Sequence, residues 1–315
     1  YLHWRTHGIF FSFLCVMFRA YYVGITQTKI LTVNSIVMLL SNVALNYCLI
    51  FGKGGFPAAG IAGAAIASSV SEAVSLLFFI IYTSMTADKR KYGFRRAFTL
   101  RPHLLKGMLS ISGWTMVQSF ISVSIWFIFF LAIEHLGERP LAVTNIVRNI
   151  SALLIMVISA FATTAGALIS NQIGAGEQRC LFKTCGMTLK LTYAILIPLL
   201  IILCLFPEPV LRAFTDSPSL IAASVNSVYV MASSTLIMAP SFILFNAVSG
   251  TGNTRAGFIM EMISLAVYTA VIYYGIIRLK PDVALCWFSE HVYGVTLIFL
   301  AWWYLKSGKW RGKKV

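Results

Sequence analysis

The stretch that decides the fold is TADKRKYGFRRAFTLRPHLLK, from Thr86 to Lys106. It is a long polar run in a mostly apolar chain, and it carries seven Lys or Arg residues against one acid, Asp88. Three long apolar segments precede it and six follow it. We interpret it as a cytoplasmic connector between two halves of a membrane protein, residues 1–85 and 107–315. Nucleic-acid binding is not expected, because a basic patch needs a soluble domain to carry it.

The composition excludes a water-soluble domain. The 315 residues are 58% hydrophobic and only 11% charged, whereas a soluble domain keeps roughly a quarter of its residues charged. Nine apolar runs are long enough to cross a hydrocarbon layer of about 30 Å as helices. They lie near residues 7–27, 31–51, 59–84, 105–134, 141–168, 182–207, 221–249, 257–278 and 283–305. The predicted class is therefore an all-α polytopic membrane protein.

The basic residues predict the orientation of the chain. With the connector inside, 16 Lys or Arg residues fall on the inner side and six on the outer side. Three more, Arg19, Arg148 and Lys190, fall within apolar segments. This asymmetry is typical of multi-pass proteins, whose cytoplasmic loops are basic. We expect a multi-pass protein of the cytoplasmic (inner) membrane of a bacterium, with a cytoplasmic C-terminus.

A short internal repeat predicts two matched lobes. Residues Gly24 to Lys29 and Gly250 to Arg255 both read G-x-x-x-T-[K/R], and each closes a helix that runs from outside to inside. Two copies in the same orientation are typical of parallel repeats related by an axis along the membrane normal. Three helices separate the connector from the second copy, and none precedes the first. We therefore expect about three further helices before Tyr1, and a complete molecule of six plus six.

No catalytic or metal-binding motif appears in the chain. There is no phosphate-cradling loop, H-E-x-x-H or G-x-S-x-G. The six cysteines share no spacing and lie mostly in apolar runs, where a free thiol behaves as a small hydrophobe. We expect no enzyme activity, no cofactor and no metal.

Three acids at membrane depth are candidate cation-coupling residues, because a charge in a membrane usually faces a cavity. Glu72 is the deepest, about thirteen residues into its segment, and a satisfied ion pair or hydrogen bond is the alternative interpretation. Glu261 lies closer to the inner end, where a structural pair with Arg255 competes. Glu290 lies on the last helix.

Other polar and aromatic residues are candidates to line a central cavity. Uncharged amides in a membrane more often pair helices than bind ligands, so that alternative stays open for each Asn and Gln. A cavity with aromatic walls suits hydrophobic cations. Arg19 either reaches the interface or partners one of the acids. The candidates are Asn42, Asn46, Gln118, Trp114, Arg19, Asn145 and Arg148.

Four motifs resemble the multidrug and toxic compound extrusion (MATE) family along essentially the whole chain. They are Asn42-x3-Asn46-Tyr47-x-Leu-Ile-Phe-Gly52, Gly60-Ile-Ala-Gly-Ala-Ala-Ile-Ala67, Ser170-Asn-Gln-Ile-Gly-Ala-Gly-Glu177 and Ser249-Gly-Thr-Gly-Asn-Thr254. The family has twelve helices in two lobes, so the resemblance implies that this chain corresponds to the fourth to twelfth.

The resemblance implies export of small cationic or amphiphilic molecules in exchange for protons or sodium. Two departures from the family pattern concern the coupling acid. Asn46 stands where one branch has an acid in an N-x3-D motif, and Gln118 lies where another branch has a buried Glu. We therefore place the coupling role on Glu72, Glu290 and Glu261.

We expect an ion-coupled efflux transporter that works by alternating access, with membrane lipid and small amphiphilic or cationic substrates as its partners. It is expected to act as a monomer, and replacing Glu72 with Gln is expected to abolish coupled efflux. Three alternatives stay open. They are a lipid-linked oligosaccharide flippase of the same superfamily, a membrane-embedded enzyme, and a structural membrane scaffold.

Overall fold

The computed structural model describes residues 2–55, 57–86, 101–308 and 310. Helices dominate this part of the chain, and it contains no β-strand. Within it, nine helical segments are long and apolar enough to cross a membrane. The predicted class, an all-α polytopic membrane protein, is confirmed.

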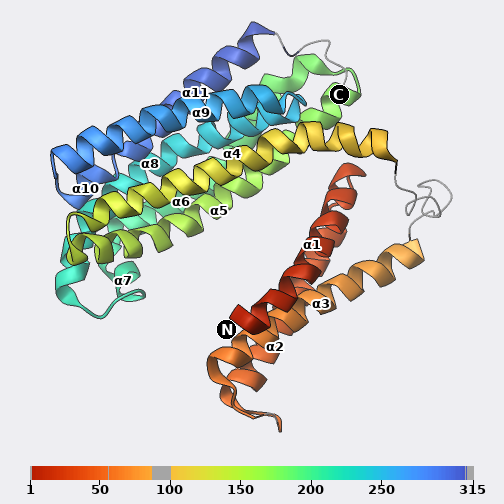
Figure 1. Ribbon diagram of the computed structural model, residues 1–315, viewed down its shortest axis with the longest axis horizontal. Coiled ribbons are helices and arrows are strands. Elements are labelled where there is room, and N and C mark those ends of the chain that lie inside the picture. Colours follow the sequence, from red (N-terminus) through yellow and green to blue (C-terminus); the bar gives the residue numbers. More distant parts are fainter. Residues whose placement is uncertain (1, 56, 87–100, 309, 311–315) are drawn as a thin grey trace. The chain divides into compact units, whose positions relative to one another are not determined.

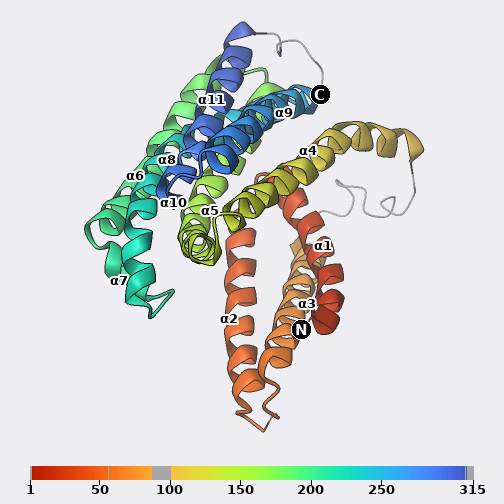
Figure 2. The same cartoon turned by 60° about the vertical axis from the view of Figure 1, so that its left-hand side comes forward.

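The chain forms two compact units, Tyr1–Leu100 and Arg101–Val315, which we call the N unit and the C unit. The described helices of the N unit are α1 (Leu2–Gly24), α2 (Lys29–Phe51) and α3 (Gly60–Thr86). Helix α3 packs against both α1 and α2 (Figures 1 and 2). The core of the N unit is made by Cys15, Tyr22, Ile30, Leu76 and Phe79.

The C unit contains six membrane-length segments and several short helices. Its elements are α4 (Pro102–Glu134), α5 (Glu138–Gly174), the 3-10 turn η2 (Gln178–Cys180), α6 (Leu181–Leu205), α7 (Pro207–Arg212), α8 (Pro218–Gly250), α9 (Thr254–Val271), the π-helical segment η3 (Ile272–Arg278), α10 (Val283–Cys286) and α11 (Ser289–Ser307). Helix α8 is the centre of this unit, because it packs against α5, α6, α9 and α11.

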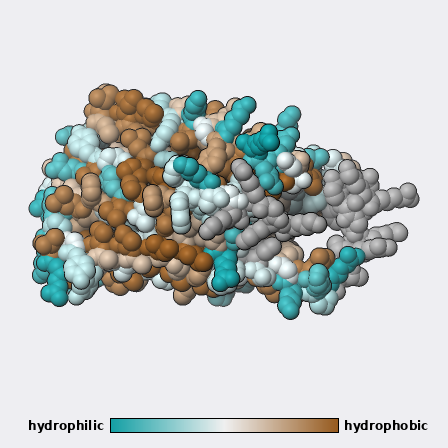
Figure 3. Space-filling model, turned by 90° about the horizontal axis from the view of Figure 1, so that it is seen from above, coloured by the Kyte–Doolittle hydropathy of each residue, from teal (hydrophilic) through white to brown (hydrophobic). Residues whose placement is uncertain are grey.

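Apolar side chains cover much of the surface. Phe10, Phe13 and Met17 on α1 are each more than 60% exposed, as are Phe120 on α4 and Met156 on α5. Figure 3 shows hydrophobic side chains over broad areas of the molecule. Such surfaces are unfavourable in water and neutral in lipid, which fits a multi-pass membrane protein.

Two boundaries of the predicted segments differ in the structure, at the start of α4 and within the last segment. Residues 87–100, most of the predicted connector, lie outside the described residues, so the position of the connector stays a prediction. Its last residues are helical, since Pro102 starts α4 and proline suits the first helical turn. The last predicted segment is interrupted, because α10 ends at Cys286 and α11 starts at Ser289.

Glycines let the helix backbones approach closely. A Cβ added to Gly63 on α3 would collide with the carbonyl oxygen of Leu49 on α2. A Cβ on Gly166 of α5 would lie 2.9 Å from the carbonyl oxygen of Asn246 on α8. Gly250, near the end of α8, likewise meets the backbone of Gly166. Close packing of small residues is a principal source of helix association in membranes.

We predict that Gly166→Ala destabilises the C unit by about 1–3 kcal/mol, because the added methyl overpacks the crossing of α5 and α8. Gly186→Ala on α6 is the matched control, since no atom lies within 4 Å of its added Cβ. The control should be neutral or stabilising, because alanine favours helices over glycine. Thermal unfolding of the detergent-solubilised variants measures the difference, and equal shifts for both would contradict the close crossing.

Candidate functional site

A cavity of about 460 Å³ lies within the C unit, among α4, α5, α8, α9 and α11. This volume falls within the range of roughly 300–1,000 Å³ found for small-molecule sites. Its walls are mainly apolar and aromatic, with a few polar groups. The lining includes Ser122, Trp126, Arg148, Glu261, Tyr268, Glu290 and Tyr293.

Helical spacing explains why these side chains meet. Arg148, Ser151, Ile155 and Ser159 of α5 line the cavity and recur every three or four residues along one face of the helix. Ala152 and Met156 lie beside them on the same face. On α9, residues 261, 265 and 268 follow the same spacing. Each helix therefore turns one continuous face toward the cavity.

Glu261 on α9 is buried at the cavity wall, with 4% of its surface exposed. Its carboxylate accepts a hydrogen bond of 2.9 Å from the Ser122 hydroxyl on α4. It also accepts bonds of 2.9 and 3.1 Å from the hydroxyl of Tyr293 on α11. The alternative of a pair with Arg255 is wrong, because the two residues form no ion pair in the described part of the chain. The Arg255 guanidinium lies 5.9 Å from the ring centroid of Trp114.

Glu290 lies in the first turn of α11 and faces the same cavity. Its carboxylate accepts a 2.7 Å hydrogen bond from the hydroxyl of Tyr268 on α9. The two helices therefore exchange partners: the tyrosine of each donates to the glutamate of the other. The tyrosine rings themselves meet edge to face, with centroids 5.8 Å apart.

Arg148 brings a positive charge to the cavity that holds the two carboxylates. Its guanidinium lies 5.3 Å from the ring centroid of Phe130 on α4, within cation–π range. Its Nε is buried and has no hydrogen-bond partner in the described structure. Among the described residues, the carboxylates of Glu261 and Glu290 are not in ion-pair distance of this arginine.

A second hollow of about 360 Å³ shares Val123, Trp126 and Arg148 with the cavity. It extends toward Glu134 at the end of α4 and Asn145 on α5. The Asn145 side chain donates to the carbonyl of Leu141 on its own helix. Arg148 therefore lies where the two hollows meet.

Gln118 and Trp114 lie on α4 before the cavity begins. Gln118 is half-buried one helical turn before Ser122, the first α4 residue of the lining. The Trp114 ring packs against Phe258 of α9, with centroids 5.1 Å apart. Their lining of a wider central cavity stays a prediction.

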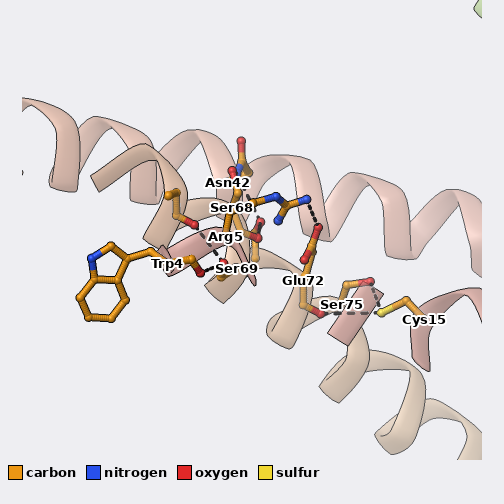
Figure 4. A network of polar contacts seen from close by, with 10 residues as sticks. Trp4, Arg5, Cys15, Asn42, Ser68, Ser69, Glu72 and Ser75 are labelled. Carbon is orange, nitrogen blue, oxygen red and sulfur yellow. Dashed lines mark hydrogen bonds and ion pairs between the residues drawn. The ribbon is translucent and has the colours of Figure 1, made fainter. Parts of the chain in front are cut away.

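Glu72 belongs to a separate polar network in the N unit. Its carboxylate accepts a 2.7 Å charged hydrogen bond from Arg5 on α1, and its side chain is 13% exposed. Figure 4 shows the two side chains directed at each other, with Ser69 bonded to the Trp4 carbonyl beside them. The alternative of an ion pair thus describes one carboxylate oxygen of Glu72, whereas the other, Oε2, is buried without a hydrogen-bond partner in the described structure. Its coupling role stays a proposal.

Asn42 and Asn46 lie on one face of α2. Asn46 donates to the side-chain oxygen of Asn42 at 2.9 Å, and Asn42 reaches the hydroxyls of Ser68 and Ser71 on α3 at 3.5 and 3.3 Å. These contacts match the alternative of amides that pair helices. Whether the two amides also line a cavity stays a prediction.

Arg19 lies on the exposed side of α1. The alternative in which Arg19 partners one of the three acids finds no support, because Glu72 binds Arg5 and the other two glutamates bind tyrosines. The alternative in which Arg19 extends to the membrane interface agrees with its exposure.

Sequence reasoning missed four residues that complete these sites: Arg5, Ser122, Tyr268 and Tyr293. A signal was present for the tyrosines, because each lies on the same helix as a candidate glutamate, at spacings of seven and three residues. Arg5 is one of the six basic residues that the sequence places on the outer side, ahead of the first predicted helix, whereas α1 starts at Leu2 and includes it. In the described part of the chain, no group of three or more His, Cys, Asp or Glu residues is arranged to hold a metal ion.

Related proteins and solved structures identify the family of the chain. The chain is 26% identical over 291 residues to a probable multidrug resistance protein NorM of Thermotoga maritima, covering 87% of this chain and 59% of that protein. It is 25% identical to the uncharacterized transporter YisQ of Bacillus subtilis, covering 81% of this chain and 56% of that protein. The chain thus spans less than two thirds of these relatives. One is described as a probable multidrug resistance protein and the other as a transporter, which agrees with the expectation of no enzyme activity.

Solved structures match the fold. A mutant of the Vibrio cholerae MATE transporter VcmN superposes with a TM-score of 0.83 at 12% identity, covering 98% of this chain and 68% of that one. A multidrug resistance MATE family transporter of the MOP superfamily, in an outward-facing conformation, gives a TM-score of 0.76 at 16% identity, covering 87% and 61%. The MatE family model itself matches residues 115–274, about half of the chain. This protein therefore belongs to the MATE family.

Proposed function

We propose that this protein is a secondary transporter that exports small amphiphilic organic cations in exchange for protons or sodium. The observation that carries the proposal is the cavity of the C unit, in which Glu261 and Glu290 lie among aromatic walls. The related proteins described as multidrug resistance proteins support the same activity.

The cavity suits an organic cation for two reasons. Trp126, Phe242, Tyr268 and Tyr293 offer ring faces that attract a positive charge and stack on a flat apolar ligand. The two carboxylates supply the negative charge that such a ligand needs to leave water. Met156 and Met238 add flexible side chains that fit ligands of different shape.

The same carboxylates are our first candidates for the coupling site. Each is held by neutral hydroxyl donors instead of a fixed cation. A proton or a sodium ion can therefore neutralise it, and a substrate cation can compete for it. Exchange of one monovalent cation for one proton or sodium ion moves no net charge, so the ion gradient drives it: a tenfold ion gradient, about 1.4 kcal/mol, supports a tenfold substrate gradient. Glu72, which is paired with Arg5, is the second candidate.

We infer that residues 1–85 and 107–315 belong to two lobes, which residues 86–106 connect. The lobes open a central cavity alternately to each side of the membrane. The predicted orientation places the connector and the C-terminus in the cytoplasm of a bacterial cell. We propose that the protein acts as a monomer in lipid.

We predict that Glu261→Gln and Glu290→Gln each lower ion-driven export by about tenfold or more, because the neutral amide cannot exchange a proton for a cation. The measurement is efflux of ethidium by the full protein in energised vesicles, with the proton and sodium gradients collapsed separately. The collapse that stops efflux identifies the coupling ion.

Glu208→Gln is the matched control for this experiment, since Glu208 is exposed on α7, outside the lining of the cavity. It should retain coupled efflux at a matched protein level. Undiminished coupled efflux by both glutamate variants would contradict the assignment of the coupling site to this cavity.

Arg148 opposes the entry of a cation, so we predict that Arg148→Gln tightens binding of a monovalent organic cation. The expected gain is about three- to tenfold, the equivalent of roughly 0.7–1.4 kcal/mol of removed repulsion. The control is Arg278→Gln, which removes the same charge from an arginine beside Tyr273, outside the lining of the cavity. Ethidium titration of the purified protein measures both, and equal shifts would reject a local effect.

The ion pair in the N unit predicts a double-mutant result. Arg5→Gln and Glu72→Gln should each destabilise the protein by about 1–3 kcal/mol, because each leaves a partly buried charge without its partner. The double variant should lose less than the sum of the two. Thermal unfolding tests this, and additive losses would mean that the pair contributes nothing. Loss of ion-driven efflux in Glu72→Gln at a matched amount of folded protein would support Glu72 as the coupling acid.

A further inference from the structure

A third hollow lies on the surface of the C unit, where α5 and α6 meet. This groove has a volume of about 340 Å³ and shares no residue with the cavity of the two glutamates. Its lining is mainly apolar and largely exposed: Met187 is 61% exposed and Leu191 is 55% exposed. The lining residues are Ala160, Phe161, Thr164, Leu168, Gln172, Thr184, Met187, Thr188 and Leu191.

Two lysines flank the groove on α6. Lys183 and Lys190 are seven residues apart, so they lie on the same side of the helix, two turns or about 10 Å from each other. Met187, which lines the groove, lies between them. Leu181, Cys185, Thr188 and Thr192 of the same helix are buried, so the lysines point away from the core.

Neither lysine has an acidic partner within ion-pair distance among the described residues. Both are exposed, and Lys190 lies nine residues after the first residue of α6, about 13 Å along the helix. An ammonium group at that depth of a membrane-spanning helix is expensive unless it extends to the interface or binds an anion. Arg179, on the turn before α6, adds a third exposed cation, with Glu177 as the nearest acid in sequence.

We propose that this groove binds an anionic phospholipid. The phosphate lies between the ammonium groups of Lys183 and Lys190, and an acyl chain lies along Met187 and Leu191 in the groove. The Thr184 hydroxyl donates to the side-chain oxygen of Gln172 at 2.9 Å, so this bond joins α5 and α6 at the level of Lys183. Charge complementarity selects an anionic headgroup, and the apolar lining selects an acyl chain over a soluble anion.

The experiment compares lipid selectivity in the full protein reconstituted into phosphatidylcholine vesicles that contain spin-labelled phosphatidylglycerol or spin-labelled phosphatidylcholine. The protein prefers phosphatidylglycerol. In the Lys183→Gln/Lys190→Gln double variant, which lacks both cations, the ratio of phosphatidylglycerol binding to phosphatidylcholine binding falls about tenfold. The charge-preserving Lys183→Arg/Lys190→Arg variant retains it.

Two controls separate this site from general surface charge. Lys306→Gln removes a cation that lies 4.6 Å from the ring centroid of Trp302 on α11, and it leaves the preference unchanged. Leu191→Trp fills the groove and lowers the binding of both lipids. An unchanged preference in the double lysine variant overturns the proposal, as does an equal loss for both lipids in that variant. The readout is independent of transport, so the result does not depend on the export proposal.

Discussion

A lipid bilayer offers a protein chain no hydrogen-bond partners, and this constraint governs the whole structure. It forces each segment into a helix that satisfies its own backbone. It also removes the hydrophobic drive between helices, because lipid is as apolar as leucine. Association then depends on the contacts described above: glycines where α5 and α8 cross, and side-chain hydrogen bonds elsewhere. In the N unit, the side-chain amide of Asn34 donates to the Ser75 hydroxyl at 2.8 Å, and that hydroxyl donates to the side-chain oxygen of Asn34 at 3.1 Å.

The sequence predicted the fold well, because length and hydropathy are local properties. All nine apolar runs correspond to membrane-length helical segments of the described structure, and most ends agree within a few residues. What failed was local irregularity. The π-helical segment Ile272–Arg278 and the break between Cys286 and Ser289 depend on packing against neighbouring helices, which hydropathy does not record.

The candidate site was predictable only in part, for a physical reason. The depth of a glutamate along its helix follows from the residue count, so Glu261 and Glu290 were found. Its partner lies on another helix, whose rotation and height a residue count does not give. The sequence therefore suggested Arg255 for Glu261, whereas packing supplies Ser122 and Tyr293. Arg5 was missed in the same way as the partner of Glu72.

The exchanged glutamate and tyrosine pairs have a mechanical consequence. Along α9, Glu261 and Tyr268 are seven residues or about 10 Å apart, whereas Glu290 and Tyr293 are only about 4.5 Å apart along α11. The two bonds are therefore inclined toward each other between the helices. A slide of α9 along α11 in either direction slackens one bond and stretches the other. Sideways separation of the two helices stretches both bonds together, so the two pairs resist separation more than they resist a slide.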